Sequence, residues 1–156
     1  MLGKNFAERA HAQLIRDPTL INLYGTPTLL MHGDTLCTDD MQYQKARARY
    51  HNPLFQALLL RLPLSWRHQL ARKLRADSEA NKKGKSVDIM DVTPATVEQT
   101  LRAHHYPRLI HGHTHRPARH VHTVDGHACE RWVLYDWYQR GGYLYCDAQG
   151  CEARSL

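Results

Sequence analysis

The chain has 156 residues, 42% of them hydrophobic and 23% charged, and 21 Lys and Arg against 15 Asp and Glu give a net charge of +6 with histidine neutral. This composition excludes a disordered, collagen-like or low-complexity chain and fits one domain with a modest core. No purely apolar run exceeds four residues, as in Ala57 to Leu60, so we expect neither a membrane-spanning helix nor an export signal. The cysteines form no C-x-x-C pair and are expected to be reduced thiols in a cytoplasm; they are Cys37, Cys129, Cys146 and Cys151.

The first predicted elements are a helix and two short strands. Apolar spacing predicts a helix over residues 1 to 16, which Asp17-Pro18 ends. Apolar β-type runs follow at Thr19 to Tyr24 and Thr28 to Met31, and Gly25-Thr26-Pro27 predicts the turn between them. The second run leads directly into a histidine, a glycine and an aspartate. That position, at the carboxyl end of an apolar strand, is where open α/β sheets place their chemistry.

The middle of the chain is predicted to be mostly helical. Capping residues and prolines predict helix starts at Thr38, Asn52-Pro53, Ser65 and Thr93-Pro94. The segment RADSEANKKGKS, residues 75 to 86, is polar and basic and favours a loop. In the last helix Val97 and Leu101 share one face.

The remainder of the chain is predicted to be β. Arg108 to His111 reads as a strand, and residues 118 to 124 and 130 to 137 as a hairpin around Asp125-Gly126. Two further strands, Gly142 to Cys146 and Cys151 to Ser155, are expected to continue this meander. No internal repeat and no linker divides the chain.

Histidine is the unusual residue type, with 12 in the chain. Seven lie between residues 104 and 122: His104, His105, His111, His113, His115, His120 and His122. A solvated polar surface accounts for most of them. In an extended segment alternate side chains project to one side, so His113 and His115 could share one cation, and His32 ends another strand in the same way. Three imidazoles could then hold one Zn²⁺, Mn²⁺ or Fe²⁺.

Three aspartates follow His32, and each could be a metal ligand, an orienting partner of an imidazole or a substrate contact. For Asp39 the simpler interpretation is charge compensation at a helix N-terminus, whereas Asp34 and Asp40 keep the other roles open.

A basic tract from Arg61 to Lys85 accompanies the leucines of residues 54 to 64. A solvated face is the plain explanation of the tract, but its apolar content favours an acyl chain or an anionic bilayer over nucleic acid.

Two blocks, MHGDTLCTDD (Met31 to Asp40) and LIHGHTHRP (Leu109 to Pro117), together resemble the calcineurin-like metallophosphoesterases. More closely they resemble the UDP-2,3-diacylglucosamine diphosphatases, which are peripheral membrane hydrolases of bacterial lipid A synthesis. The stretches KLRADSEANKKGKSVDIMDV and VLYDWYQRGGYLYC are also similar to that family, so the resemblance covers essentially the whole chain.

The resemblance implies an α/β fold, the C-terminal part of a four-layered α/β/β/α sandwich, with a helical cap within residues 40 to 105 whose groove takes acyl chains. It implies two Mn²⁺ ions and hydrolysis of the pyrophosphate of UDP-2,3-diacylglucosamine to UMP and 2,3-diacylglucosamine 1-phosphate (lipid X), at the inner face of the inner membrane. Matching positions are His32, His113 and His115 as metal ligands, and Asp40, Ser78, Lys85 and His113 as substrate contacts. A family asparagine matches Asn81 if one residue is gapped, or Lys82 if none is.

The chain also departs from that family. The family's D-x-H strand end, its G-D carboxylate that bridges the metals and its G-N-R segment have no counterpart in this sequence. Residues 1 to 4 resemble the sequence that follows the G-N-R segment, so we expect the first part of the family chain to be absent, through a fragment or a start codon at an internal methionine. Three neutral imidazoles do not offset the charge of two cations. We therefore expect neither a full dinuclear site nor substantial hydrolysis, and we expect an uncovered sheet edge.

Other functions also fit the sequence. Another calcineurin-like phosphoesterase would act on soluble phosphoesters and would not need the apolar helical stretch of residues 53 to 74. A non-catalytic module could bind nucleic acid through residues 61 to 85, which salt-dependent binding to unrelated duplexes would reveal. A histidine-rich module could bind zinc alone through His113 and His115.

Overall fold

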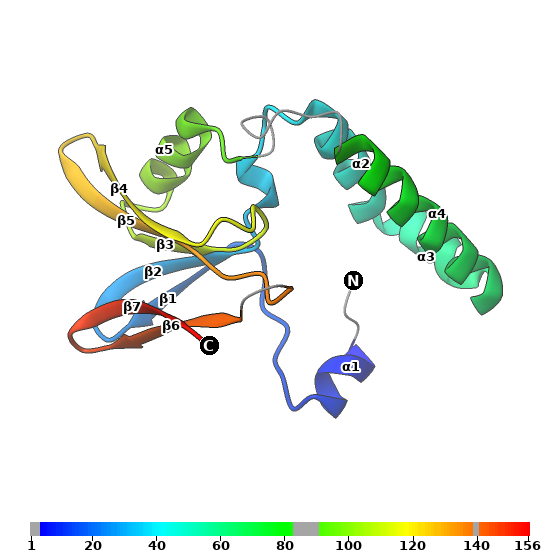
Figure 1. Cartoon of the computed structure of the whole chain (residues 1–156), viewed down its shortest axis with the longest axis horizontal. Helices are drawn as coiled ribbons and strands as arrows, with labels where there is room; N and C mark the ends of the chain where they lie inside the picture. Colours follow the sequence, from blue (N-terminus) through cyan, green and yellow to red (C-terminus); the bar gives the residue numbers. More distant parts are fainter. Residues whose placement is uncertain (1–3, 83–90, 139–140) are drawn as a thin grey trace. The chain divides into compact units, whose positions relative to one another are not determined.

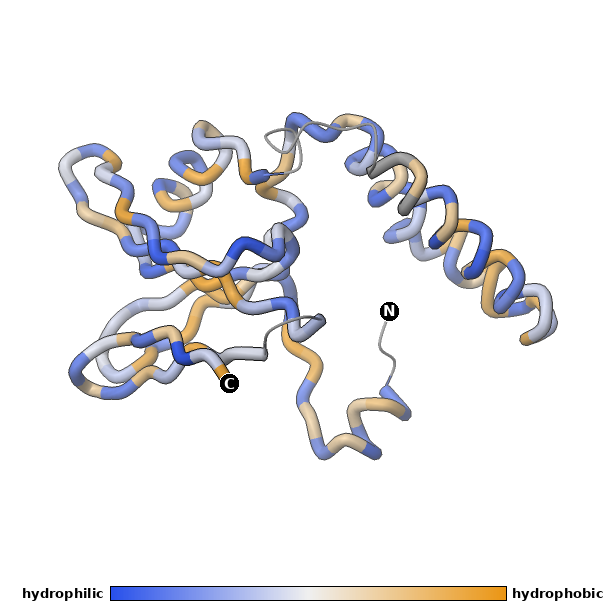
Figure 2. The backbone as a smooth tube through the Cα atoms, in the orientation of Figure 1, coloured by the Kyte–Doolittle hydropathy of each residue, from blue (hydrophilic) through white to orange (hydrophobic). Residues whose placement is uncertain are grey.

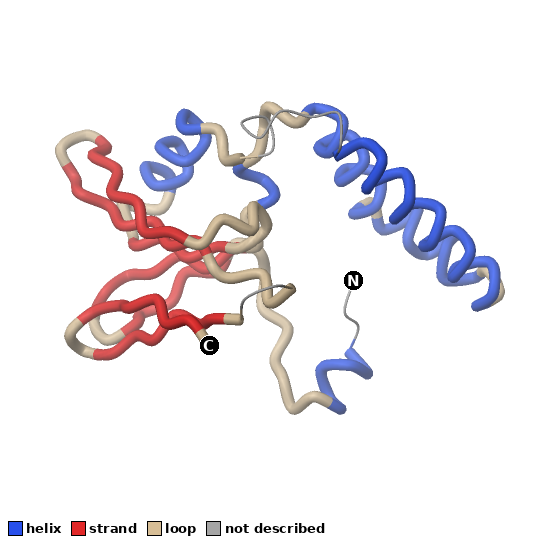
Figure 3. Tube along the Cα trace, in the orientation of Figure 1, coloured by secondary structure: helices blue, strands red, loops and turns tan. Residues whose placement is uncertain are grey.

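The computed structural model describes residues 4–82, 91–138 and 141–156. Its chain forms two compact units, one of residues 1–33 with 98–156 and one of residues 34–97. All strands of the described residues lie in the first unit, and helices make up most of the second (Figure 3). We call them the sheet unit and the helical unit. The α/β class is confirmed as a mixed sheet with helices, and the extent of a helical cap over residues 40 to 105 stays a prediction.

The sheet unit contains a five-stranded mixed sheet in the order β1-β2-β3-β5-β4 (Figure 1). Its strands are β1 (Thr19–Leu23), β2 (Thr26–Met31), β3 (Arg108–His111), β4 (Ala118–Val124) and β5 (His127–Val133). The neighbours β2, β3 and β5 run parallel, whereas β1 and β4 pair antiparallel with β2 and β5. The carboxyl ends of β2 and β3 therefore lie at the same edge of the sheet.

The core of this unit lies on the central strands. Successive residues Thr28 and Leu29 of β2, and Leu109, Ile110 and His111 of β3, are all buried. Because successive side chains point to opposite faces, such a run shows that the strand is covered on both faces, as parallel strands usually are. The hydropathy of the backbone follows this pattern, with apolar segments at the centre of the sheet (Figure 2).

Two tight turns correct the strand limits that the sequence predicted. Tyr24-Gly25 and Asp125-Gly126 both have left-handed backbone, with φ of 50° and 84° and of 51° and 83°. Two such residues make the type I′ turn that matches strand twist, so pairing continues directly on either side. Thr26-Pro27 therefore belongs to β2 rather than to the turn, and β5 begins at His127 rather than at residue 130.

The last two strands form a sheet of their own, so the expected continuous meander is wrong. β6 (Gly142–Asp147) and β7 (Gly150–Ser155) pair antiparallel as a separate two-stranded hairpin. A cavity of about 360 Å³ lies between this hairpin and the main sheet, lined mostly by apolar residues that include Ile110 of β3 and Leu144 of β6.

The N-terminal helix is much shorter than expected. α1 (Lys4–Arg9) ends where His11 adopts left-handed backbone with φ of 47°. The Ala12 N–H then bonds the carbonyl of Ala7 at 2.9 Å and the His11 N–H bonds that of Glu8 at 3.2 Å. These two bonds form a Schellman motif, which satisfies the last carbonyls of a helix and stops it.

The helical unit is built from η1 (Asp34–Leu36), α2 (Met41–His51), α3 (Pro53–Arg61), α4 (Leu64–Lys82) and the start of α5 (Pro94–Ala103). The N-cap of α2 is Asp40, which accepts the Tyr43 N–H at 3.0 Å, and not the expected Thr38. The Thr38 hydroxyl instead bonds those of Thr93 and Thr96, each at 2.9 Å, and this joins the start of the unit to its end.

The starts of α3 and α5 confirm the sequence pattern. Asn52 caps α3 through the amides of the next turn, Pro94 begins α5, and both Val97 and Leu101 are fully buried. The loop expected from residue 75 is wrong as far as Lys82, because no glycine or proline interrupts the helix-forming residues there. Across the described ranges, no helix is both long and apolar enough to cross a membrane.

Candidate functional site

Two histidines from different loops meet at the carboxyl edge of the main sheet. Met31 of β2 and His111 of β3 are paired in the parallel register, so the residues that follow each strand leave the sheet side by side. The Gly112 N–H bonds the carbonyl of His32 at 3.0 Å, and this holds the two loops together. The rings of His32 and His113 lie 5.0 Å apart between centroids, edge to face at 66°. The structure thus brings together two of the three predicted imidazoles.

The third imidazole, His115, has other neighbours. Its Nδ1 lies 3.3 Å from Oδ2 of Asp136, and its ring stacks on Tyr138 with centroids 5.9 Å apart. The expectation of an extended segment is wrong, because His113 and His115 both have left-handed backbone, with φ of 70° and 57°. Alternate side chains then no longer share one side. Within residues 4–82, 91–138 and 141–156 no three His, Cys, Asp or Glu side chains gather closely enough to hold a metal ion.

His111 is a structural residue that the sequence did not distinguish from its neighbours. Its side chain is fully buried, so the expectation of a solvated histidine is wrong here. Arginine can only donate, so the 3.1 Å contact from Nη1 of Arg131 makes Nε2 of His111 the acceptor. Nδ1 then carries the proton and donates it to the carbonyl of Gly112 at 2.9 Å. The ring therefore fixes the peptide that precedes His113.

Gly33 allows His111 to take this place. A Cβ at Gly33 would lie 2.6 Å from Nδ1 of His111, closer than real Cβ contacts occur, and the φ of Gly33 is +102°. Only glycine meets both conditions without strain. The glycine that directly follows His32 is the signal in the sequence for this close packing.

The buried arginine extends the network to the edge strand β4. Nε of Arg131 donates to Nε2 of His122 at 3.0 Å, and Arg131 itself is 5% exposed. Burial and the guanidinium together lower the pKa of His122 below its ordinary 6.5. The imidazole is therefore held neutral, as an acceptor of the arginine N–H.

Asp34 has a structural role within the helical unit. Its carboxylate is buried and forms a 2.6 Å ion pair with Nε of Arg47. The Tyr43 hydroxyl donates to the same oxygen at 3.4 Å, and burial together with the Asp34 charge raises the pKa of Tyr43 to about 12. These contacts anchor α2 to the turn that follows Gly33.

The predicted substrate contacts belong mainly to the helical unit. Asp40 caps α2 with a side-chain oxygen, and Asp39, which was expected to compensate helix charge, is exposed and lies before the cap. Ser78 is exposed on α4 rather than in a loop, and Asn81 lies in the last turn of the same helix. The side chains of Asn81 and Lys82 and the whole of Lys85 lie outside the described part of the chain.

Helices α3 and α4 expose apolar and basic side chains together. Leu54, Leu58, Leu60, Leu64 and Trp66 are between 59% and 80% exposed. Basic residues of the predicted tract also lie exposed on these helices: Arg61, Arg72, Lys73 and Arg75. The mixture is visible as alternating apolar and polar segments along both helices (Figure 2). We call these residues the Leu/Arg surface.

The chain is similar to curated bacterial hydrolases over nearly its whole length. It is 51% identical to UDP-2,3-diacylglucosamine hydrolase of Aromatoleum aromaticum and 49% identical to that of Nitrosococcus oceani. Each alignment extends over 150 residues and covers 96% of this chain. The chain is a homologue of the UDP-2,3-diacylglucosamine hydrolases. The hydrolase of Chromobacterium violaceum is 49% identical over the full chain. The resemblance predicted from the two histidine blocks is therefore confirmed.

The match covers only part of each hydrolase. The chain spans 61%, 60% and 65% of the relatives from A. aromaticum, N. oceani and C. violaceum. No protein-family model matches the chain.

Proposed function

We propose that this chain carries part of the catalytic machinery of a UDP-2,3-diacylglucosamine hydrolase. The reaction would cleave the pyrophosphate bond of UDP-2,3-diacylglucosamine to give UMP and 2,3-diacylglucosamine 1-phosphate, a step of lipid A synthesis. The observation that carries this proposal is the identity of about half over 150 residues with hydrolases of that name. The juxtaposed rings of His32 and His113 at the carboxyl edge of the sheet support it.

The two imidazoles at this edge would supply two of the ligands of one divalent cation. Neutral imidazoles are good ligands for Mn²⁺, Zn²⁺ and Fe²⁺, and those of His32 and His113 lie in ring contact. We propose these two as ligands and His115, on the same loop, as a third; in this structure His115 instead contacts Asp136. A divalent cation would supply Lewis-acid polarisation of a phosphoryl oxygen. The Mn²⁺ pair implied by the resemblance would need bridging carboxylates, which the described residues do not add to these rings.

The hydrolase proposal is tested by UMP release from UDP-2,3-diacylglucosamine with Mn²⁺ present. We expect the 156-residue chain alone to release little UMP, because the described residues form no two-metal site. A chimera that adds the part of the A. aromaticum relative beyond the match should release UMP. In that chimera His113→Ala should abolish activity, whereas the control His105→Ala, at an exposed histidine outside the site, should not. An inactive chimera beside an active relative would contradict the proposal.

The helical unit supplies the lipid-binding part of this proposal. In a four-layered α/β/β/α sandwich, α2 to α4 would form the helical cap, and the Leu/Arg surface would take the acyl chains and contact the anionic inner face of the inner membrane. Exposed leucines beside arginines suit this role, because apolar side chains enter acyl chains while cations stay at the headgroups. Asp40, Ser78, Asn81, Lys85 and His113 are the proposed substrate contacts.

Vesicle binding tests the membrane contact separately from hydrolysis. We expect binding to anionic phospholipid vesicles to weaken at least about tenfold when Leu58 and Leu60 are both replaced by serine, since each loses apolar area that would be buried. Val121→Ser is the matched control, because Val121 is 59% exposed but lies on β4 of the sheet unit. An equal loss of vesicle affinity in Val121→Ser would contradict specific binding through the Leu/Arg surface. Tighter, salt-dependent binding to duplex DNA than to vesicles would favour a nucleic-acid module instead.

A further inference from the structure

The β6–β7 hairpin places two cysteine side chains next to each other. Cys146 and Cys151 are direct partners in its register, and Asp147 and Gly150 close the hairpin around a two-residue turn. Directly opposite residues of an antiparallel pair have Cα atoms about 4.5 to 5.5 Å apart. That spacing falls within the range a disulfide requires.

The two thiols are free and in contact. Both cysteines are reduced and half-buried. Burial, with a hydrogen bond to Cys151 and the charge of that thiolate, raises the pKa of the Cys146 thiol to about 12. Cys37 and Cys129 differ, because each is only 2% exposed.

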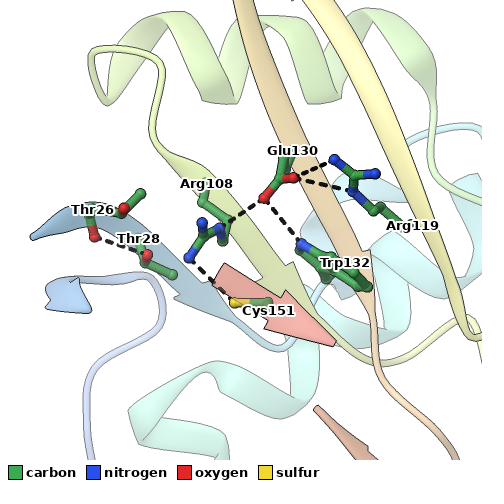
Figure 4. Close-up of polar contacts among 7 residues, drawn as sticks. All are labelled: Thr26, Thr28, Arg108, Arg119, Glu130, Trp132 and Cys151. Atoms are coloured by element: carbon green, nitrogen blue, oxygen red, sulfur yellow. Dashed lines mark hydrogen bonds and ion pairs between the residues drawn. The ribbon is translucent and has the colours of Figure 1, made fainter. Parts of the chain in front are cut away.

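A cation stands beside one member of the pair. Nη1 of Arg108 lies 3.2 Å from Sγ of Cys151, while Nε of the same guanidinium bonds Glu130 at 3.0 Å (Figure 4). Arg119 bonds the other oxygen of Glu130 (Figure 4). The N–H of Arg108 is directed at this sulfur and would offset the negative charge that develops there as the sulfur attacks. Cys151 is thus the better placed attacking thiol, whereas the raised pKa of Cys146 keeps that thiol protonated.

We propose that Cys146 and Cys151 form a redox-active dithiol site that reacts with low-molecular-weight disulfides. The Cys151 thiolate attacks one sulfur of the small disulfide, forms a mixed disulfide and releases one small thiolate. Cys146 then loses its proton and attacks Sγ of Cys151, and this forms the cross-strand disulfide and releases the second small thiolate. The chain loses two electrons and two protons, and the small disulfide is reduced to two thiols. Once Cys151 is bonded, its charge no longer opposes ionisation of Cys146.

The test uses the whole 156-residue chain with oxidised glutathione, followed by intact mass and peptide mapping. We expect a Cys146–Cys151 disulfide, with Cys37 and Cys129 unmodified. Bridging should be about tenfold faster in the native chain than in urea, because the paired strands hold the sulfurs together while the unfolded loop must close first. Cys146→Ser should accumulate the mixed disulfide on Cys151. The proposal is overturned if native and urea-treated chains bridge at equal rates, or if the mixed disulfide persists in the unsubstituted chain.

A pair of arginine variants separates the thiol chemistry from general loosening of the hairpin. Both Arg108→Gln and Arg119→Gln remove a partner of Glu130, but only the first removes the cation beside Cys151. We expect Arg108→Gln to slow the first reaction step severalfold and Arg119→Gln to leave it unchanged. Equal rates in the two variants would contradict the role of Arg108.

Discussion

The sheet unit and the helical unit differ in where they place their large apolar side chains. In the sheet unit the leucines of the central strands are enclosed, with Leu29 and Leu109 fully buried. In the helical unit neither α2 nor α3 has a buried residue, and Leu54 is 80% exposed. The central strands of the sheet unit therefore enclose their leucines, whereas α3 and α4 leave most of theirs exposed.

Core and surface leucine substitutions provide the largest contrast between the units. Leu109→Ala should lower the free energy of unfolding by about 2–5 kcal/mol, because it leaves a cavity in a packed core. Leu58→Ala should change it by less than about 0.5 kcal/mol, since that side chain is 62% exposed. Urea unfolding followed by circular dichroism measures both. Similar losses would show that the helical unit depends on its exposed leucines for folding.

The glycine beside His111 provides the next largest effect. Gly33→Ala should lower the free energy of unfolding by about 1–3 kcal/mol, because the backbone there is left-handed and the new methyl group would also lie too close to the buried imidazole. Gly25→Ala is the matched control, since Gly25 also has positive φ but nothing lies within 4 Å of its Cβ position. It should cost about 1 kcal/mol. Thermal unfolding compares the two, and an equal cost would argue against tight packing at Gly33.

The His122 network predicts acid sensitivity of the sheet unit. The pKa of His122 is lowered in the folded chain, so below pH 6.5 the unfolded chain binds a proton that the folded chain does not. Stability is therefore fully present above 6.5 and falls as the pH drops through the lower folded value. His122→Gln should flatten the pH dependence of urea unfolding in this range, and His105→Gln, at an exposed histidine outside the network, should not. An unchanged slope in His122→Gln would contradict the network.

The smallest effect is expected at the turn between β4 and β5. Asp125 accepts hydrogen bonds from Arg102 and Tyr106, which lower its pKa to about 2. Its contribution is present above the ordinary value of 3.8 and is lost as the pH falls through about 2. Asp125→Asn keeps the turn preference but should remove this loss, which acid titration of unfolding would show. Because the group is exposed, its effect at neutral pH should be slight.

Much of the fold followed from local patterns. The apolar runs predicted the central strands, Asp125-Gly126 predicted a hairpin, and Asn52-Pro53 predicted the start of α3. The meeting of His32 and His113 followed from one further rule, that parallel strands end at the same edge. Errors arose where a boundary depended on a single residue, as at His11, which ends α1 through its left-handed backbone.

The sequence by itself determined the elements, their turns and the strand ends that carry polar residues, because these depend on neighbouring side chains and backbone preference. Tertiary structure decided which histidines are buried, which meet and which bind elsewhere. His111, His113 and His115 alternate in one short segment but have different partners. His111 is hydrogen-bonded to Arg131, His113 contacts the ring of His32, and His115 contacts Asp136. Their different surroundings come from the register of β2 with β3 and from the backbone turns at residues 113 and 115, and both depend on packing between distant parts of the chain.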